Sequence, residues 1–317
     1  MTDLTRTARP RRGSGRLADV VFRGSSRIAA GVVVALLILI ALLLFVNSRL
    51  TWQTFGLGFI TGTEWDPVAG IYGAFPFIVG TILAATIAVI LAAPIGIFTA
   101  IYLSELAPGR LATPLTFMIE LLAAIPSVVI GLWGVFILAP FLRGTVEAWI
   151  VSVFGWIPFL GGPAYGIGLF SAGVILTIMI LPTIVTISRE VIGAVPGSQR
   201  EAMVALGATR WETIRRAVIP FARSGIIGAV ILGLGRALGE TMAVTMVIGN
   251  KDAIPNSLFD QTQTIASKIA TSFSEATVGI QTSSLIALGL VLLVMTIIMN
   301  VIARLLVWRV AGPVAGE

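Results

Sequence analysis

Residues 201–220 read EAMVALGATRWETIRRAVIP, a compact charged stretch in a chain whose neighbouring segments are apolar. The segments 167–188 and 224–235, on either side of it, contain no Asp, Glu, Lys or Arg. The charged side chains of the stretch itself are Glu201, Arg210, Glu212, Arg215 and Arg216. Charge gathered between two long apolar segments indicates a polar connection between two membrane-spanning helices.

The composition identifies lipid as the solvent for most of this chain. Hydrophobic residues make up 57% of the 317 residues and charged residues 11%, whereas a soluble chain carries about 25% charged residues. Cys and His are both absent, which excludes disulfides, thiol redox chemistry and imidazole metal sites. The net charge of +6 would also suit a nucleic-acid-binding protein, so the location of the basic residues has to decide that question.

Six apolar segments are long enough to span a bilayer, because a hydrocarbon core of about 30 Å requires ~20 apolar residues in a helix. They are Ile28–Val46, Phe77–Tyr102, Leu115–Leu138, Ile167–Ile187, Gly225–Ile248 and Leu285–Leu306. The first follows a basic tail, as a signal peptide would, but its apolar run is too long and no small-residue cleavage site follows it. The sequence therefore predicts a retained anchor and an all-α integral membrane protein with six transmembrane helices.

The arginines lie mainly on one side of these predicted helices. That side holds the tail 1–27, Arg110, the stretch 189–223, Arg304 and Arg309. The loops on the opposite side hold Arg49, Arg143, Lys251 and Lys268. By the positive-inside rule, both termini and the stretch 189–223 are predicted to be cytoplasmic in a multi-pass membrane protein. Because this distribution reflects topology, we expect membrane lipid and no nucleic acid as a partner.

The chain is thereby divided into four predicted regions. These are a basic cytoplasmic tail at 1–27, a transmembrane anchor at 28–48, a core of five transmembrane helices at 73–309 that includes the cytoplasmic loop 189–223, and a short tail at 310–317.

The charged loop has the pattern of a surface helix. Gly207 divides it into two helical runs, and in the second run Trp211, Ile214 and Val218 recur at helical spacing and form one apolar face. Glu212 precedes Arg215 and Arg216 by one turn, which predicts ion pairs on the charged face. Such a helix either docks into a groove of a cytoplasmic partner or lies on the lipid headgroups, and periodicity alone leaves both interpretations open.

Arg236 is the one arginine that belongs to neither side of the membrane. It lies eleven residues into the predicted helix Gly225–Ile248, which at 1.5 Å per residue places it roughly 16 Å deep, near the bilayer midplane. A midplane arginine is costly and is functional by default, and its planar fork suits bidentate contact with a phosphate-like oxyanion. Glu240 follows one turn later on the same predicted face. The alternative is an internal Arg236–Glu240 ion pair that neutralises itself.

The stretch from Glu201 to Pro220 resembles the EAA loop of ABC-transporter permeases, whose pattern runs roughly EAA-x3-G-x9-I-x-LP. Glu201-Ala202-Met203, Gly207 and Ile219-Pro220 match it, with Met203 in place of the second Ala. In that family the loop docks into the ATP-hydrolysing subunit. The resemblance implies a role in ATPase coupling for seven residues: Glu201, Ala202, Gly207, Ala208, Arg210, Trp211 and Glu212.

Four further stretches resemble the PstC-type permease subunit of the bacterial phosphate ABC importer. They are TGTEWDPVAGIYGAFPFIVGT (61–81), ELLAAIPSVVIGLWG (120–134), LPTIVTISREVIGAVPGSQREA (181–202) and GRALGETMAVTMVIGN (235–250). The resemblance implies the type I (MetI-like) ABC importer permease fold and ATP-driven import of phosphate by alternating access across the bacterial cytoplasmic (inner) membrane. It also implies that Arg236, Glu240 and Thr241 belong to the substrate pathway.

The chain is expected to work without catalytic residues, metal or cofactor of its own. Its lysines follow no glycine-rich phosphate-binding loop, so ATP and Mg would be held by partner ATPase subunits. The resemblance implies a PstA-like second permease as heterodimer partner, two copies of a PstB-like ATPase and a PstS-like extracytoplasmic phosphate-binding protein. Three alternatives stay open: a permease for another tetrahedral oxyanion such as molybdate or sulfate, an ion-coupled secondary transporter, and a non-transporting membrane anchor.

Overall fold

The structure is a computed structural model that describes residues 15–311, with side chains from 20 to 305. Within these described residues, six helices are long and apolar enough to cross a membrane, as predicted. These spans are Val20–Asn47, Phe75–Leu106, Ser127–Phe154, Leu169–Gly193, Arg210–Gly239 and Ile280–Leu305. Strand structure in the described residues is confined to one short antiparallel hairpin, β1 (Trp65–Asp66) and β2 (Ile71–Tyr72).

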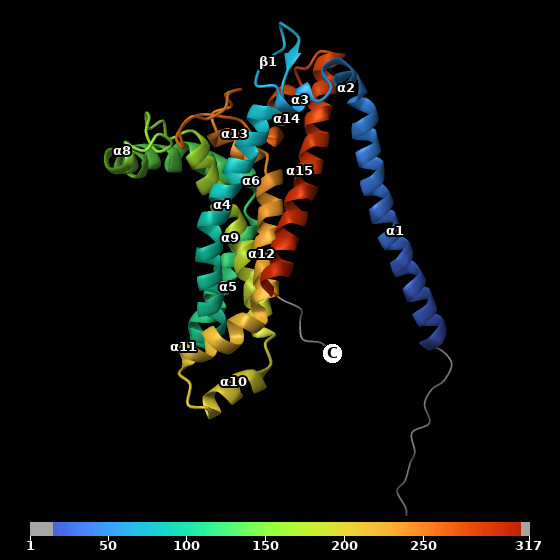
Figure 1. The fold of residues 1–317 in the computed structure, drawn as a ribbon. Helices are drawn as coiled ribbons and strands as arrows, with labels where there is room; N and C mark the ends of the chain where they lie inside the picture. The colour runs from blue at the N-terminus through green and yellow to red at the C-terminus, as the bar shows by residue number, and fades with distance from the viewer. Residues whose placement is uncertain (1–14, 312–317) are drawn as a thin grey trace, which may run out of the picture.

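The first helix is held at one end only. α1 (Gly15–Asn47) begins inside the predicted tail 1–27 and leans away from the other helices along most of its length (Figure 1). α2 (Arg49–Phe55) and α3 (Gly58–Thr61) then lead to the hairpin. On α2, the buried Thr51 hydroxyl donates to Ser283 Oγ at 2.9 Å and lies 3.2 Å from Ser284 Oγ. This polar contact fixes α2, and with it the end of α1, to the last helix, α15 (Ile280–Ala311).

The centre of the bundle is the close packing of α4 (Phe75–Ile101) against α9 (Leu169–Gly193). Glycines make this approach possible, because a Cβ at Gly96 would overlap Ile184, and a Cβ at Gly173 would overlap Ile87. α12 (Ile219–Gly239) packs on both helices and also on α15. α14 (Ile265–Ser272) closes the end of the bundle near the hairpin.

The predicted third helix, 115–138, is wrong as a single element. α5 (Gly109–Ala124) ends before Ile125, whose extended ψ of 128° follows from its position before Pro126. α6 (Ser127–Trp133) starts directly after the proline. The helix then continues through η2 (Gly134–Leu138), α7 (Ala139–Phe141), η3 (Leu142–Glu147) and α8 (Ala148–Phe154). The sequence remains apolar across the break, so hydropathy did not reveal it.

The predicted fifth helix, 225–248, is also interrupted and begins earlier. α11 (Arg210–Thr213), η4 (Ile214–Val218) and α12 form one continuous helical run that ends at Gly239. A separate short helix, α13 (Met242–Val247), follows. The second half of the charged stretch is therefore the beginning of a membrane helix rather than a separate surface helix.

A second, smaller hydrophobic cluster lies at the end of the bundle that carries the charged loop. It joins the ends of α4 and α9 to η4 and α12, and consists of Ala100, Ile101, Ile192, Val195, Ile214, Val218, Ala222 and Ile226. Beyond it projects α10 (Gly197–Ala205), which has no buried residue. The described ends of α1 and α15 lie at this same end of the molecule (Figure 1). We call α10, α11 and the turn between them, residues 197–213, the tip.

Cysteine labelling will test the predicted orientation of this bundle. Single cysteines at Ser198 in the tip and at Val68 and Val278 near the opposite end replace exposed residues of a naturally Cys-free chain. In spheroplasts, a membrane-impermeant maleimide is expected to label Val68→Cys and Val278→Cys but not Ser198→Cys. Permeabilised cells should label all three. Labelling of Ser198→Cys before permeabilisation would contradict a cytoplasmic tip.

Candidate transport path and coupling surface

Arg236 lies on a face of α12 that no other part of the described chain covers. It belongs to the last turn of the helix, and its side chain is exposed. Leu232, one turn earlier, is 58% exposed. A Cβ added at Gly228 or Gly239 would meet no atom within 4 Å. An arginine and small residues thus share one uncovered stripe of an otherwise packed helix.

The neighbouring helix α15 shows where along the bundle this arginine lies. A Cβ at Gly235 would lie 3.9 Å from Asn300 Oδ1, so Asn300 is at the level of Arg236. Asn300 follows the start of α15 by twenty residues and precedes its end by eleven, which corresponds to roughly 30 and 16 Å along the helix axis. Arg236 therefore lies far from both ends of the bundle, as measured along the axis of α15. Asn300 escaped the sequence analysis because a single amide in an apolar helix carries no pattern.

Glu240 does not share a helical face with Arg236, contrary to the prediction. α12 ends at Gly239 and Glu240 has extended backbone angles, φ −70° and ψ 128°. The Glu240 carboxylate accepts a hydrogen bond from Ala243 N at 3.3 Å, at the start of α13. The two ion pairs formed by the described residues are Arg200–Glu105 and Lys268–Asp252, so the alternative of an Arg236–Glu240 pair is wrong for this structure.

Thr241 continues the polar turn between α12 and α13. Its hydroxyl donates to Gly239 O at 3.3 Å, and its carbonyl accepts from the Thr245 hydroxyl at 2.7 Å. Arg236, Glu240 and Thr241 thus occupy the end of one helix and the break that follows it. Irregular backbone at membrane depth is tolerated where it is buried in protein or lines a polar cavity.

The two helices of the tip are joined by a turn that favours glycine. Gly207 has a φ of +78°, in the left-handed region, as expected for a turn that a Cβ would strain. Thr209 then caps α11: its hydroxyl accepts from Glu212 N at 3.3 Å, while Glu212 Oε2 accepts from Thr209 N at 2.8 Å. Glu212 is used in this capping box, and the predicted ion pairs with Arg215 and Arg216 do not occur in the described structure.

The apolar face predicted for Trp211, Ile214 and Val218 is wrong as a surface for a partner. Ile214 and Val218 are buried in the small cluster of the chain's own helices. Trp211 is 53% exposed and joins two residues of the first run, Val204 at 62% and Leu206 at 84%. Glu201, Ala202 and Arg210 are exposed around them, and Ala208 and Glu212 are half-buried. All seven predicted coupling residues thus lie in the tip, together with two exposed apolar side chains, Val204 and Leu206, that the sequence analysis did not single out.

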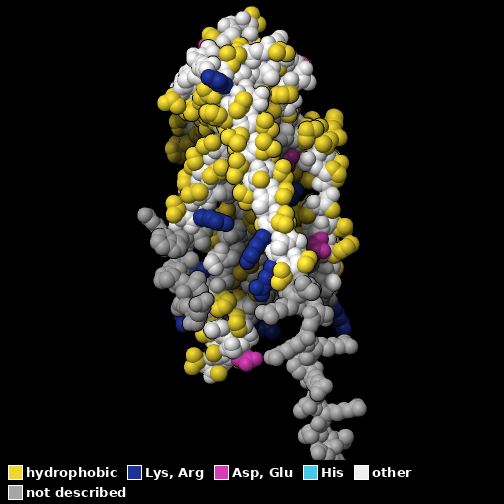
Figure 2. Space-filling view, turned by 90° about the vertical axis from the view of Figure 1, so that its right-hand side faces the viewer, with side chains coloured by type: hydrophobic (Ala, Val, Ile, Leu, Met, Phe, Trp, Pro, Cys, Tyr) yellow, Lys and Arg dark blue, Asp and Glu magenta, His cyan; other side chains and the backbone are white. Residues whose placement is uncertain are grey.

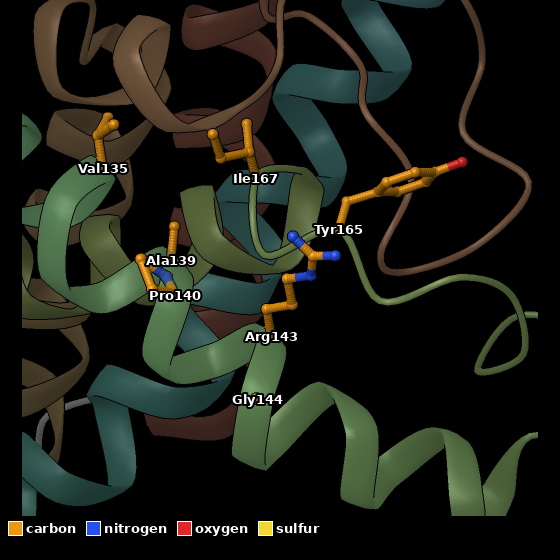
Figure 3. Close-up of a pocket in the computed structure, with 7 residues that line it drawn as sticks. All are labelled: Val135, Ala139, Pro140, Arg143, Gly144, Tyr165 and Ile167. Atoms are coloured by element: carbon orange, nitrogen blue, oxygen red, sulfur yellow. The ribbon is translucent and has the colours of Figure 1, made fainter.

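A cavity of about 390 Å³ lies elsewhere, between η2, α7, η3 and the segment before α9. It is lined by Val135, Ala139, Pro140, Arg143, Gly144, Tyr165 and Ile167. Figure 3 shows the Arg143 guanidinium pointing toward the Tyr165 side chain, whose hydroxyl points away. None of the predicted pathway residues lines this cavity.

Figure 2 shows that the side chains on the visible face of the bundle are mostly apolar, with Lys and Arg gathered mainly toward one end.

Comparison with known proteins identifies relatives along almost the whole chain. Residues 92–312 match the family described as "Binding-protein-dependent transport system inner membrane component". The chain is 47% identical over 298 residues to the "Phosphate transport system permease protein PstC" of Mesorhizobium japonicum, covering 93% of this chain and 91% of that protein. The protein of the same name from Haemophilus influenzae is 42% identical, covering 92% of this chain and 93% of that protein.

Two solved structures share the architecture at low identity. A chain of the MetNI methionine ABC transporter in an inward-facing conformation matches with a TM-score of 0.56 at 17% identity, covering 78% of this chain and all of that chain. A chain of a bacterial ABC transporter involved in alginate import matches with a TM-score of 0.55 at 16% identity and covers 92% of this chain. These likenesses concern the fold alone.

Proposed function

The chain belongs to the PstC-type permeases of the binding-protein-dependent transport family, and we propose that it carries inorganic phosphate across the bacterial inner membrane as one subunit of an ATP-driven importer. Its fold is the type I ABC importer permease fold that the sequence predicted. The assignment of phosphate as the cargo is supported by the relatives named "Phosphate transport system permease protein PstC". The seven predicted coupling residues in the tip would contact the ATPase subunit and transmit its conformational change during ATP hydrolysis. Arg236, Glu240 and Thr241 would contact phosphate during its passage.

The observation that carries this proposal is the uncovered Arg236. A guanidinium on a membrane helix cannot face hydrocarbon cheaply, since placing arginine at the bilayer centre costs ~2.5–3.5 kcal/mol even on insertion scales. In this chain it is exposed on a stripe with Leu232 and open glycines. A second permease subunit that covers this stripe would enclose the arginine in a polar path. We therefore place the PstA-like partner, and the phosphate path, against this face of α12.

Within such a path, the separation of Arg236 from Glu240 suits passage rather than tight binding. The guanidinium has no ion-pair partner in the described structure, so its donors remain available for two oxygens of a phosphate. The Glu240 carboxylate, which accepts from Ala243 N just beyond the end of α12, adds negative charge to this turn and weakens retention of the anion. An ion must be able to leave a site as well as enter it. Alternating access would expose this site to one side of the membrane at a time.

The tip supports docking of the ATPase subunits. Three large apolar side chains of the tip, on Val204, Leu206 and Trp211, are each more than half exposed. Surfaces of this kind mark interaction sites, because burying them in a partner removes apolar area from water. We assign this surface to a PstB-like ATPase, which binds ATP and Mg. The complete importer would contain two copies of this ATPase, one docked to each permease. A PstS-like binding protein would deliver phosphate at the opposite end.

Two alternatives are less well supported. A secondary transporter would use membrane carboxylates to couple ions, and it would need no docking surface at the tip. A permease for molybdate or sulfate would use the same arginine, so only the relatives favour phosphate.

Uptake measurements will test the function directly. The chain, expressed with its partner subunits in a bacterium that lacks its own phosphate permeases, is expected to restore uptake of radiolabelled phosphate. Excess arsenate should compete, whereas sulfate and molybdate should not. A tagged form of the chain should retain an ATPase subunit after solubilisation. Competition by molybdate, or uptake without any ATPase subunit, would contradict the phosphate importer assignment.

A further inference from the structure

Arg200 connects three elements at the end of the bundle that bears the tip. It belongs to α10, and its guanidinium contacts the carboxylate of Glu105, with NH2 2.6 Å and Nε 3.2 Å from Oε1. Its NH2 also donates to Ile192 O at 3.0 Å, and its NH1 donates to Val195 O. One side chain of the tip thus holds the last turn of α9, the connection after it, and the end of the α4 helix.

This arginine is a principal link between α10 and the membrane helices. No residue of α10 is buried, so packing contributes little to its position. The second run of the tip, by contrast, is anchored by Ile214 and Val218 in the small cluster. The Arg200–Glu105 pair is partly shielded, with side chains 27% and 13% exposed. Shielding and a forked geometry make such a pair stronger than an ordinary surface ion pair.

Glu105 lies at a special place in the helix that receives this contact. The α4 helix ends in a π-helical turn, η1 (Tyr102–Leu106), closed by a hydrogen bond from Ala107 N to Tyr102 O at 2.7 Å. Turns of this kind are rare and occur often at functional sites. α4 is also the helix that packs along α9 and against α12, which carries Arg236. A displacement of the end of α4 would therefore shift the helices packed against it, α9 and α12, in the centre of the bundle.

We propose that Arg200 is a positioning residue for coupling, which fixes α10 to the end of α4 so that a movement of the docked tip moves α4. This inference rests on the proposed docking of an ATPase at the tip. Without the pair, the tip still offers its exposed apolar side chains to the ATPase, but a movement of α10 is absorbed in the connection 194–196 and does not reach α4. ATP is then hydrolysed with little transport.

The experiment compares transport with hydrolysis in the assembled complex. The complete importer, reconstituted in proteoliposomes with binding protein and phosphate, is measured with wild-type chain, Arg200→Gln, Arg200→Lys and Glu105→Gln. We expect the phosphate transported per ATP hydrolysed to fall at least tenfold for Arg200→Gln. Arg200→Lys should recover part of it, because the charge is kept and the fork is lost. Arg110→Gln, which removes an exposed arginine from the start of α5, directly after η1, is the matched control and should leave the ratio unchanged.

A purely structural role would give a different result. If Arg200→Gln lowers the amount of complex but each assembled complex keeps the wild-type ratio of transport to hydrolysis, the coupling role is wrong. A loss of the ATPase subunit from the wild-type complex would instead contradict the proposed function. In that case spin labels on the full chain still test the link. The distance distribution between labels at Ser198→Cys and Phe98→Cys should broaden in Arg200→Gln, and an unchanged distribution would overturn the proposal.

Discussion

Phosphate uptake is expected to fall to near background when Arg236 is replaced by glutamine. The change keeps hydrogen-bonding ability but removes the charge, and losing charge-assisted contacts of ~1.5–3 kcal/mol at the barrier corresponds to a roughly ten- to hundredfold slower passage. Arg236→Lys should recover only part of the rate, because an ammonium lacks the bidentate geometry. Glu240→Gln should slow uptake less than Arg236→Gln. Initial rates of uptake in cells lacking other phosphate permeases provide the measurement.

Stability separates this prediction from a packing effect. The Arg236 side chain is exposed and forms no ion pair within the described residues, so Arg236→Gln should not reduce the amount of inserted protein or its melting temperature. Arg223→Gln is the matched control, since it removes an exposed arginine from the same helix nearer the tip. Near-normal uptake by Arg236→Gln would make the arginine a packing residue and leave phosphate transport resting on the relatives alone.

Substituting Leu206 by glutamate is expected to abolish phosphate-stimulated ATP hydrolysis by the complex. Leu206 is 84% exposed in the isolated chain, so the new charge should be tolerated during folding. In the docked state it would be buried without a partner, at a cost of several kcal/mol. Reversing the charge with Glu201→Arg should act in the same direction. Co-purification of the ATPase subunit and its stimulated turnover measure the effect.

The same substitution at the opposite end of the molecule is the control. Val68 is 98% exposed in the hairpin connection, and Val68→Glu should leave the ATPase subunit bound. Gly207→Val should weaken docking by another route, because a β-branched residue does not tolerate the left-handed φ of +78°. Normal retention of the ATPase by Leu206→Glu would place the docking surface elsewhere.

The number and approximate position of the membrane helices could be read from the sequence because the free energy of transfer into lipid depends on composition over about twenty residues. That sum is insensitive to the neighbours a helix later acquires. It is equally insensitive to helix breaks. The proline at position 126 and the end of α12 at Gly239 divide two predicted helices, since Ile125 and Glu240 take extended backbone angles while the surrounding sequence stays apolar.

The tip shows the same limit for amphipathic patterns. Helical spacing correctly grouped Ile214 and Val218 on one face, but it could not say whether that face meets a partner or the chain's own helices. In the structure, this face packs against α4 and α9, which are distant in the sequence, and Ile214 and Val218 are therefore buried in the chain's own core. Val204 and Leu206, which remain exposed, belong to the first run, whose apolar character is weak in the sequence.

What the sequence determined by itself is therefore what local chemistry controls: a six-helix membrane protein, a charged loop with a glycine turn at Gly207, and an arginine inside an apolar helix. What only the tertiary structure decided is how these parts meet. Arg236 lies uncovered and apart from Glu240, and Arg200 reaches Glu105 across 95 residues of chain. The physical reason is that burial and ion pairing depend on distances between residues remote in sequence, and those distances are set by how the helices pack.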